Sequence, residues 1–405
     1  PALKPFTWLL TFENGGLPPG SIVSDIPTRF RTKEGLNAPE NYDRSFRGPV
    51  SVREALACSL NVPAMRALND LGGPKPLHDL LRSLGLQSIG TAWDSHGLGL
   101  TLGNAPVRLL DLTNAYATLA REGTCLPSTL ETPAILPEEQ AAPLFTRQAA
   151  YLISDILSDP EARVPSFGRG GPMELPFRCA AKTGTSSDFR DNWCMGYTKE
   201  FTVGVWAGNF DNSPMKGLSG VAGAGPIFHR TMLRLHRDTK PSWLERPEGL
   251  LDVAIDRITG KASASSGSME IIPSDRPPLP ASSSDRDGNG HVLLDSSYSE
   301  WFNSPHNRRR SQFALADNRE AEAPLRILAP RDGATYVLDP ELPNGGLLHL
   351  ATNLPGLAQW SCETLDLNPG NAEPVARLKS GEHTLVATDR RSGTKREVKI
   401  RVEQR

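Results

Sequence analysis

The sequence predicts an α+β fold, in which helices pack on an antiparallel sheet, followed by a small all-β sandwich domain. In the first part of the chain, apolar residues recur at helical spacing before and after three successive β-rich segments. After about residue 324, short apolar stretches alternate with Gly, Pro, Asn and Asp turns. Helices that flank an antiparallel meander are typical of an α+β domain, and closely spaced short strands are typical of a sandwich.

Several helices are expected in the first part. Residues 51–71 have helical periodicity that is interrupted at Asn61-Val62-Pro63, and this proline favours the first turn of a second helix over the interior of one long helix. Gly85 and Gly123 stand where helices commonly end on glycine. The remaining helices are expected over residues 75–84, 109–121, 147–158 and 225–237.

Strands and a change in composition divide the chain further. Three strands are expected over residues 178–183, 192–198 and 201–209, the last two joined by a tight hairpin at Lys199-Glu200. Residues 245–323 are rich in Pro, Ser, Gly and Asp, which indicates a linker. Within it, the aromatic island YSEWFN (298–303) is expected to dock on a neighbour. The predicted parts are therefore 1–244, 245–323 and 324–405, the last ending in a hairpin that turns at 389–393.

The composition is typical of a globular protein and excludes some classes of function. The formal net charge of −2 gives no electrostatic case for binding nucleic acid or an anionic membrane surface. No apolar run reaches the roughly 18 residues that a membrane span needs. The 8 histidines form no ligand pattern, and no CxxC pair occurs, so neither a metal nor a cofactor is expected. The cysteines are scattered: Cys58, Cys125, Cys179, Cys194 and Cys362.

Three short motifs carry the chemistry. Lys182-Thr183-Gly184-Thr185 ends a predicted strand, Ser59-Leu60-Asn61 lies at a helix end, and Lys4 stands near the start of the chain. Taken singly, these could be polar residues at a helix end and a solvent-facing strand lysine. Together they match much of the set S-x-x-K, S-D-N and K-T-G, which marks penicillin-binding proteins and class A β-lactamases.

Longer segments extend this resemblance to the class A penicillin-binding proteins. Residues 182–210 (KTGTSSDFRDNWCMGYTKEFTVGVWAGNF) resemble the third-to-fifth-strand region of their transpeptidase domain, and residues 47–68 (RGPVSVREALACSLNVPAMRAL) resemble the helix of the middle motif. Residues 97–123 resemble the stretch between these motifs, and ALKPFTWLL (2–10) resembles the sequence that follows the nucleophile. ILAPRDGATYVLDPEL (327–342) resembles the start of the C-terminal domain of the penicillin-binding protein 1C type.

The resemblance implies a role for each site residue. An acyl-transfer enzyme needs an activated serine, a base, and donors aimed at the developing oxyanion. Lys4 would accept the proton of the serine, Ser59 would bridge the two lysines, and Asn61 would orient the substrate backbone. The remaining roles belong to the predicted strand. Lys182 would supply positive charge near the substrate carboxylate, and the hydroxyls of Thr183 and Thr185 would bind that carboxylate. The backbone N–H of Thr185 would form half of the oxyanion hole, and Gly184 would keep the strand edge free of a side chain.

One position departs from the family pattern. The nucleophilic serine should stand three residues before Lys4, and that position is Pro1, which has no hydroxyl. Either Pro1 is a true substitution in an inactive homologue, or it reflects where the sequence begins. The chain starts within a motif and not at Met, so we expect a longer protein with upstream targeting and anchoring segments. The resemblance also places the first strands of the sheet upstream, and their loss would expose a sheet edge.

The predicted function is that of a serine-type D,D-transpeptidase within a bifunctional cell-wall synthase. The resemblance implies an upstream glycosyltransferase domain, a membrane anchor and a location on the periplasmic face of the bacterial inner membrane. The expected ligands are stem peptides ending in D-Ala-D-Ala and β-lactams, with synthase partners bound through the C-terminal domain. One alternative is a non-catalytic scaffold of the same fold, which Pro1 favours. Another is a β-lactamase or D,D-carboxypeptidase, which would hydrolyse; the C-terminal sandwich weighs against a β-lactamase.

Overall fold

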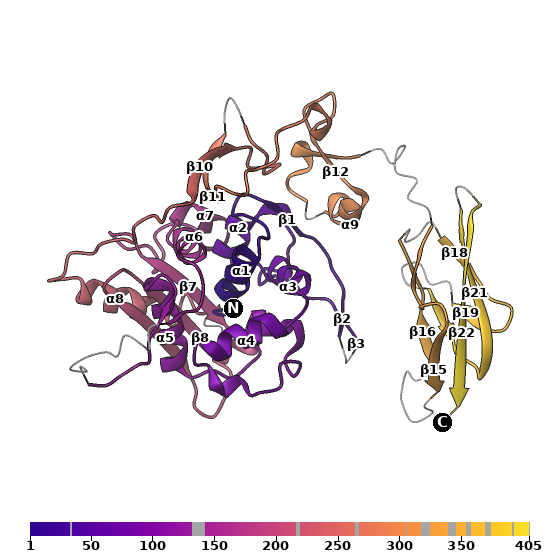
Figure 1. Ribbon diagram of the computed structural model, residues 1–405, viewed down its shortest axis with the longest axis horizontal. Helices are drawn as coiled ribbons and strands as arrows, with labels where there is room; N and C mark the ends of the chain where they lie inside the picture. The colour runs from indigo at the N-terminus through magenta and orange to yellow at the C-terminus, as the bar shows by residue number, and fades with distance from the viewer. Residues whose placement is uncertain are drawn as a thin grey trace. The chain divides into compact units, whose positions relative to one another are not determined.

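Figure 1 shows the computed structural model of the chain. It describes residues 1–32, 35–131, 142–215, 219–263, 267–305, 307–316, 325–338, 346–353, 358–368, 374–390 and 393–404. The chain divides into two units, residues 1–316 and residues 317–405, and each is considered by itself.

The first unit is built around an antiparallel sheet of β7 (Ala180–Thr185), β8 (Asp191–Tyr197) and β9 (Thr202–Gly208), in the order β7-β8-β9. The three predicted strands are therefore confirmed, with small shifts of their bounds. Because side chains alternate between the faces of a strand, each strand contributes to two cores. Met195 packs with helices α5 and α6 on one face, whereas Cys194 packs with helix α8 on the other.

The predicted helices are also confirmed, and the described residues contain further helices that were not predicted. The predicted break near Asn61 separates α2 from α3, and Ser59 lies at this break with a φ of 58°. The α-helices up to the end of the sheet region are α1 Lys4–Glu13, α2 Val52–Ala57, α3 Asn61–Asp70, α4 Lys75–Ser83, α5 Leu109–Ala120, α6 Arg147–Leu157, α7 Pro160–Phe167 and α8 Gly225–Leu235. The short 3-10 helices are η1 Gln87–Ile89, η2 Gly97–Leu102, η4 Ser187–Phe189, η5 Ser283–Asp285, η6 Ser296–Tyr298 and η7 Arg310–Gln312.

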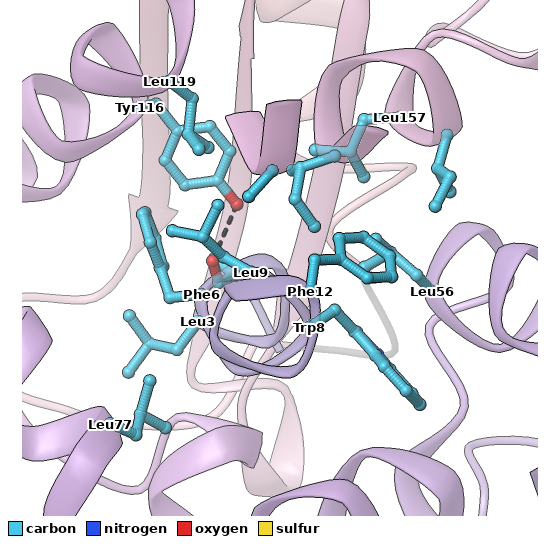
Figure 2. Packing of buried hydrophobic residues seen from close by; sticks show 14 of the residues in the cluster. Leu3, Phe6, Trp8, Leu9, Phe12, Leu56, Leu77, Tyr116, Leu119 and Leu157 are labelled. Atoms are coloured by element: carbon cyan, nitrogen blue, oxygen red, sulfur yellow. Dashed lines mark hydrogen bonds between the residues drawn. The ribbon is translucent and has the colours of Figure 1, made fainter. Parts of the chain in front are cut away.

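Helix α1 is buried on nearly all sides, as Figure 2 shows from close by. It contacts α2, α3, α4 and α6, and its Phe6 and Trp8 are fully buried. The Tyr116 hydroxyl donates a hydrogen bond of 2.7 Å to the Ala2 carbonyl and so ties the start of α1 to α5. The buried residues of α1 lie on more than one side of the helix, as expected of a helix packed inside a core. This burial fixes the position of Lys4, the first residue of the helix.

Short strand pairs complete the first unit. β1 (Ile22–Asp25) pairs antiparallel with β4 (Gly48–Ser51), β2 (Phe30–Thr32) with β3 (Gly35–Asn37), and β5 (Thr124–Cys125) with β6 (Ala142–Pro143). β10 (Leu250–Ile255) pairs antiparallel with β11 (Ser268–Pro273), and β12 (Val292–Leu294) pairs parallel with β13 (Phe313–Leu315), close to helix α9 (Ser299–Asn303).

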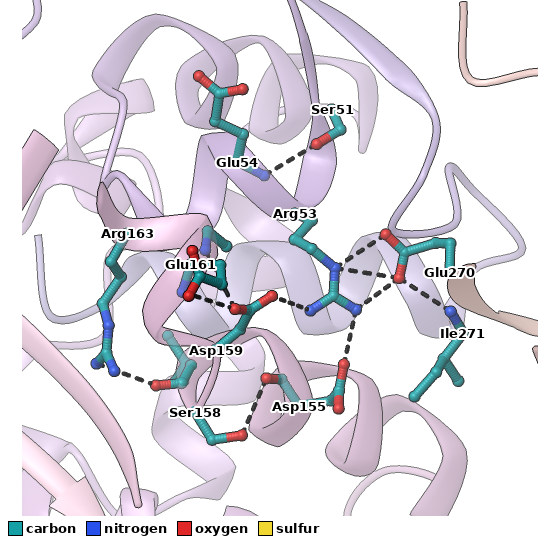
Figure 3. Close-up of polar contacts among 12 residues, drawn as sticks. Ser51, Arg53, Glu54, Asp155, Ser158, Asp159, Glu161, Arg163, Glu270 and Ile271 are labelled. Atoms are coloured by element: carbon teal, nitrogen blue, oxygen red, sulfur yellow. Dashed lines mark hydrogen bonds and ion pairs between the residues drawn. The ribbon is translucent and has the colours of Figure 1, made fainter. Parts of the chain in front are cut away.

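The β10–β11 hairpin, within the expected linker, is tied to the helices by buried charges (Figure 3). Glu270 of β11 is 5% exposed and accepts hydrogen bonds from the Arg53 guanidinium at 2.5–3.1 Å. The same guanidinium donates to Asp155 at 2.6 Å and to Asp159 at 3.1 Å. Arg53 lies on α2 and Asp155 on α6, so one guanidinium joins the hairpin to two helices.

The aromatic island packs against β4. Trp301 is 2% exposed, and its indole N–H donates to the Phe46 carbonyl at 2.9 Å. Its ring lies so close to Gly48, which has a φ of +75°, that a Cβ there would approach it to 2.3 Å. Residues 245–316 therefore cluster with the first unit, and the division of the chain falls inside the expected 245–323 linker. The identity of the three parts as separate domains stays a prediction.

The second unit is the predicted β-sandwich. One sheet has the order β15-β22-β21-β18 and another the order β16-β20-β19, while β14 pairs with β17. Leu348 of β16, Leu385 of β21 and Ile400 of β22 share one core, so the two larger sheets face each other. The predicted last hairpin is the antiparallel β21–β22 pair. The strands are β14 Ile327–Ala329, β15 Ala334–Leu338, β16 Leu347–His349, β17 Ala351–Thr352, β18 Ala358–Ser361, β19 Asp366–Asn368, β20 Val375–Arg377, β21 Gly381–Asp389 and β22 Lys395–Gln404.

A search of the described helices for a membrane-spanning segment finds none that is long and apolar enough.

Candidate active site

The three motifs, far apart in the sequence, meet around one cavity of about 380 Å³. Lys4 comes from the start of α1, Ser59 and Asn61 from the break between α2 and α3, and the Lys182–Thr185 motif from the end of β7. Six of the seven predicted residues line the cavity: Lys4, Ser59, Asn61, Thr183, Gly184 and Thr185. The seventh, Lys182, is 2% exposed and reaches the cavity through its contact with Ser59.

Ser59 lies between the two lysines. Its hydroxyl oxygen accepts hydrogen bonds from Lys182 Nζ at 2.7 Å and from Lys4 Nζ at 3.3 Å. Lys4 Nζ also donates to the Ser59 carbonyl, and Lys182 Nζ donates to the Thr183 carbonyl at 2.7 Å. The positive φ of Ser59 is uncommon for a non-glycine residue, and such backbone strain concentrates at functional sites. The strained turn presents both oxygens of Ser59 to Lys4.

Burial shifts both lysines toward the neutral amine. It lowers the pKa of Lys182 to about 7, with a smaller contribution in the same direction from the nearby Arg163 guanidinium. Burial, followed by the charge of Lys182, holds the pKa of Lys4 well below its usual range, while Asp25 acts in the opposite direction. An amine that is neutral near pH 7 can accept a proton from a hydroxyl, so this cluster can activate an oxygen nucleophile.

The end of β7 forms one wall of the cavity. Gly184 packs closely against the start of α1, because an added Cβ would lie 3.2 Å from the Ala2 nitrogen and 3.3 Å from Trp193 Cβ. The Thr185 hydroxyl accepts a hydrogen bond of 2.8 Å from the Gly220 N–H. The absence of a side chain at Gly184 thus allows β7 to approach Ala2 and Trp193 closely. The open strand edge at Gly184 stays a prediction.

Pro1 lines the cavity beside these groups. Its carbonyl accepts a 3.2 Å hydrogen bond from the Lys4 N–H, so residue 1 lies one turn before Lys4. The position expected for the serine nucleophile therefore faces the cavity, and the residue there carries no hydroxyl.

Two buried polar residues that the sequence did not single out support the site. Asp25, at the end of β1, is fully buried, and Asn41 is 5% exposed. Asn41 Oδ1 accepts a 2.8 Å hydrogen bond from the Asn61 N–H, and Asn41 also lines the cavity. Their sequence signal is weak, because one is a single aspartate in a short strand and the other an asparagine in a polar loop.

Cation-binding clusters were sought among the described residues, and no group of three or more His, Cys, Asp or Glu side chains is arranged to hold a metal ion. The five cysteines are free thiols.

A lysine-serine-lysine cluster beside a strand edge, on a helix-covered antiparallel sheet, is typical of the acyl-transfer class of proteins that carry the S-x-x-K and K-T-G motifs. Residues 2–233 match the family model described as the penicillin binding protein transpeptidase domain, and the chain belongs to this family. It is 35% identical over 228 residues to penicillin-binding protein 1C of Escherichia coli (strain K12), which covers 56% of this chain and 28% of that protein. The predicted resemblance to class A penicillin-binding proteins of the 1C type is confirmed, and the chain spans less than a third of that relative.

Solved structures agree on the fold. Penicillin-binding protein 1A from Haemophilus influenzae matches with a TM-score of 0.59 at 20% identity, over 69% of this chain and 48% of that one. PonA1 from Mycobacterium tuberculosis, in a structure in complex with penicillin V, matches with a TM-score of 0.50 at 22% identity, over 68% of this chain and 74% of that one. The α+β transpeptidase fold predicted from the sequence is thereby confirmed.

Proposed function

We propose that the first unit is the peptidoglycan D,D-transpeptidase part of a cell-wall synthase, and that its cavity binds D-Ala-D-Ala stem peptides and β-lactams. The observation that carries this proposal is the Ser59 hydroxyl held between the Lys4 and Lys182 amines at the wall of a cavity. Family membership and the penicillin V complex of PonA1 support it.

The proposed chemistry is acyl transfer through a serine. With a serine at position 1 in place of Pro1, its hydroxyl would add to the carbonyl carbon of the penultimate D-Ala, and its proton would pass to the neutral Lys4 amine. The terminal D-Ala then leaves, taking a proton relayed by Ser59, and an amine of a second stem peptide accepts the acyl group. Lys182, Thr183 and Thr185 would bind the substrate carboxylate, and the Thr185 N–H would stabilise the oxyanion.

The test is to restore the hydroxyl. We expect that Pro1→Ser, exposed to a fluorescent penicillin, gains one covalent adduct on residue 1, and that the unaltered chain gains none. Intact mass followed by peptide mapping identifies the adduct. A folded Pro1→Ser variant that stays unlabelled at saturating penicillin contradicts the transpeptidase assignment.

A second candidate function is binding without reaction, and Pro1 is the observation that favours it. A proline at position 1 leaves the amines, hydroxyls and amides of the cavity in place while removing the nucleophile. The chain would then bind peptidoglycan or synthase partners as a scaffold. Reversible binding of stem peptide by the unaltered chain, measured by calorimetry, supports this candidate, whereas a covalent adduct on that chain excludes it.

Features of the whole protein belong to the same proposal. We expect an upstream glycosyltransferase domain that polymerises lipid-linked disaccharide, a membrane anchor, and a location on the periplasmic face of the inner membrane. The support is the resemblance to relatives of which this chain covers only a part. The C-terminal sandwich would bind synthase partners.

A further inference from the structure

A chain of hydrogen bonds runs from a buried carboxylate to the catalytic-site amine. Asn41 Nδ2 donates to both carboxylate oxygens of Asp25, at 2.8 and 2.9 Å. Asn41 Oδ1 accepts the Asn61 N–H at 2.8 Å, across 20 positions of sequence. Asn61 Oδ1 then accepts from Lys4 Nζ at 2.6 Å. Asp25 is thereby connected to Lys4 through the side-chain amide of Asn41 and then through Asn61, whose backbone N–H meets Asn41 and whose side-chain oxygen meets Lys4.

The chemistry of the partners determines how both amides point. A carboxylate only accepts hydrogen bonds and a backbone N–H only donates, so Asn41 must turn its NH₂ to Asp25 and its oxygen to Asn61. Asn61 Nδ2 donates to the Glu40 carbonyl at 2.6 Å, which leaves its oxygen for Lys4. Reversing either amide would oppose donor to donor and acceptor to acceptor.

Asn41 also completes the start of helix α3. The first N–H groups of a helix have no partner within the helix and need an outside acceptor. The N-cap residue of α3 is Leu60, which has no side-chain acceptor, and Asn61 is the first helical residue. Because Asn41 accepts the Asn61 N–H, it holds the backbone that carries the Asn61 side chain.

The carboxylate contributes charge as well as geometry. Burial raises the pKa of Asp25 to about 6, while the Asn41 side chain, the Arg47 N–H and the Arg47 charge oppose this rise and Asp43 adds to it. Arg47, Asp43 and Lys4 are the charged groups that act on Asp25 among the described residues. Near neutral pH the carboxylate is ionised, and its charge raises the pKa of Lys4 against the effects of burial and Lys182.

We infer that Asp25, acting through Asn41, is a positioning residue that orients the Asn61 amide toward Lys4 and supplies a buried negative charge to the Lys4 amine. The inference rests on the proposed function only in that Lys4 is taken to be the proton acceptor of the reaction. The hydrogen bonds and the charge of Asp25 are present without substrate. Asp25 thus sets how readily Lys4 accepts a proton.

The test follows the titration of Lys4 directly. The chain is prepared with ¹³C at the lysine ε-carbons, Lys4→Arg assigns the resonance, and its chemical shift is recorded against pH without substrate. We expect Asp25→Asn to lower the midpoint of the Lys4 titration by at least about half a pH unit. Asp70→Asn, which removes the same charge from the exposed far end of α3, should leave the midpoint unchanged.

An exchange of the two side chains provides the rescue. The double variant Asp25→Asn/Asn41→Asp keeps one carboxylate and one amide in the buried pair and should return the midpoint toward that of the unaltered chain. If Asp25→Asn alone unfolds, Asn41→Ala takes its place, because it removes the two hydrogen bonds between Asn41 and the Asp25 carboxylate, and an unchanged Lys4 midpoint in that folded variant overturns the inference. A Lys4 midpoint that is the same in folded Asp25→Asn as in the unaltered chain overturns the inference. Because no substrate is used, such a result leaves the penicillin test of the proposed function untouched.

Discussion

Lys182 Nζ lies 2.7 Å from the Ser59 hydroxyl, although 123 positions separate the two residues in the sequence. Ser59 lies at the break between α2 and α3, and Lys182 lies on the edge strand β7, so the packing of these helices beside the sheet brings the two residues together. The contact joins a buried amine to a hydroxyl that opens on the cavity. The proposed chemistry depends on this pair as a unit, and several variants test it.

Removal of the Lys182 amine should abolish acylation. In the Pro1→Ser background, we expect Lys182→Ala to lower the rate of covalent labelling by penicillin at least about a hundredfold, because proton transfer through Ser59 is lost. Lys199→Ala, at the exposed turn between β8 and β9, is the matched control and should label normally. If the folded Pro1→Ser/Lys182→Ala variant is labelled as fast as Pro1→Ser, Lys182 has no role in acylation.

The same amine should make stability depend on pH. Burial lowers the pKa of Lys182 from its ordinary value of 10.5 to about 7 in the folded state, so between these values the unfolded chain binds more protons than the folded one. The free energy of unfolding therefore rises with pH, by about 2 kcal/mol between pH 7 and pH 9 from this residue. Denaturant melts of the unaltered chain and of Lys182→Met should differ by this slope, and parallel curves would contradict the pKa shift.

A methyl group at Gly184 should disturb the start of α1. The Cβ of Gly184→Ala would lie 3.2 Å from the Ala2 nitrogen, which is closer than ordinary packing allows. We expect a loss of about 1–3 kcal/mol in the free energy of unfolding. Gly171→Ala, where the added Cβ meets no atom within 4 Å, is the control. Equal melting of the two variants would show that the approach of α1 to β7 is looser than described.

The buried guanidinium of Arg53 should be essential to the first unit. Arg53→Met leaves the carboxylates of Asp155 and Glu270 without their shared partner, and we expect a loss of about 3–5 kcal/mol. Glu270→Gln should cost less, since Arg53 keeps Asp155 and Asp159. Arg44→Met, at a solvent-exposed arginine, gives the baseline for a surface change. Thermal melts rank the variants, and an order with Glu270→Gln as the worst would contradict this account.

The second unit should be dispensable for the fold of the first. The division at residue 316 leaves the described core of the first unit within residues 1–316. A chain ending at residue 316 should therefore keep a cooperative melt and the Lys4 titration of the whole chain. Loss of the cooperative transition would show that the sandwich contributes to the core.

Much of this architecture could be predicted from the sequence, because helical periodicity and β-rich runs report local structure. The break before Asn61 and the three strands of the sheet were found in this way. For residues 245–316, the docking of the aromatic island 298–303 on a neighbour was expected, but the linker-like composition does not show that Trp301 packs against Gly48 or that Glu270 pairs with Arg53. Asp25 and Asn41 were not predicted for a related reason. A polar residue can be buried only where it has hydrogen-bond partners, and these partners are distant in sequence.

The position of residue 1, one turn before Lys4 and ahead of the first helical residue, has a consequence for how this protein can change over time. Proline is tolerated where a helix begins, so we expect the fold to accept either serine or proline there. Such an exchange would alter reactivity while leaving recognition intact. Homologues could then lose or regain catalysis through a change at this one position while keeping the same fold.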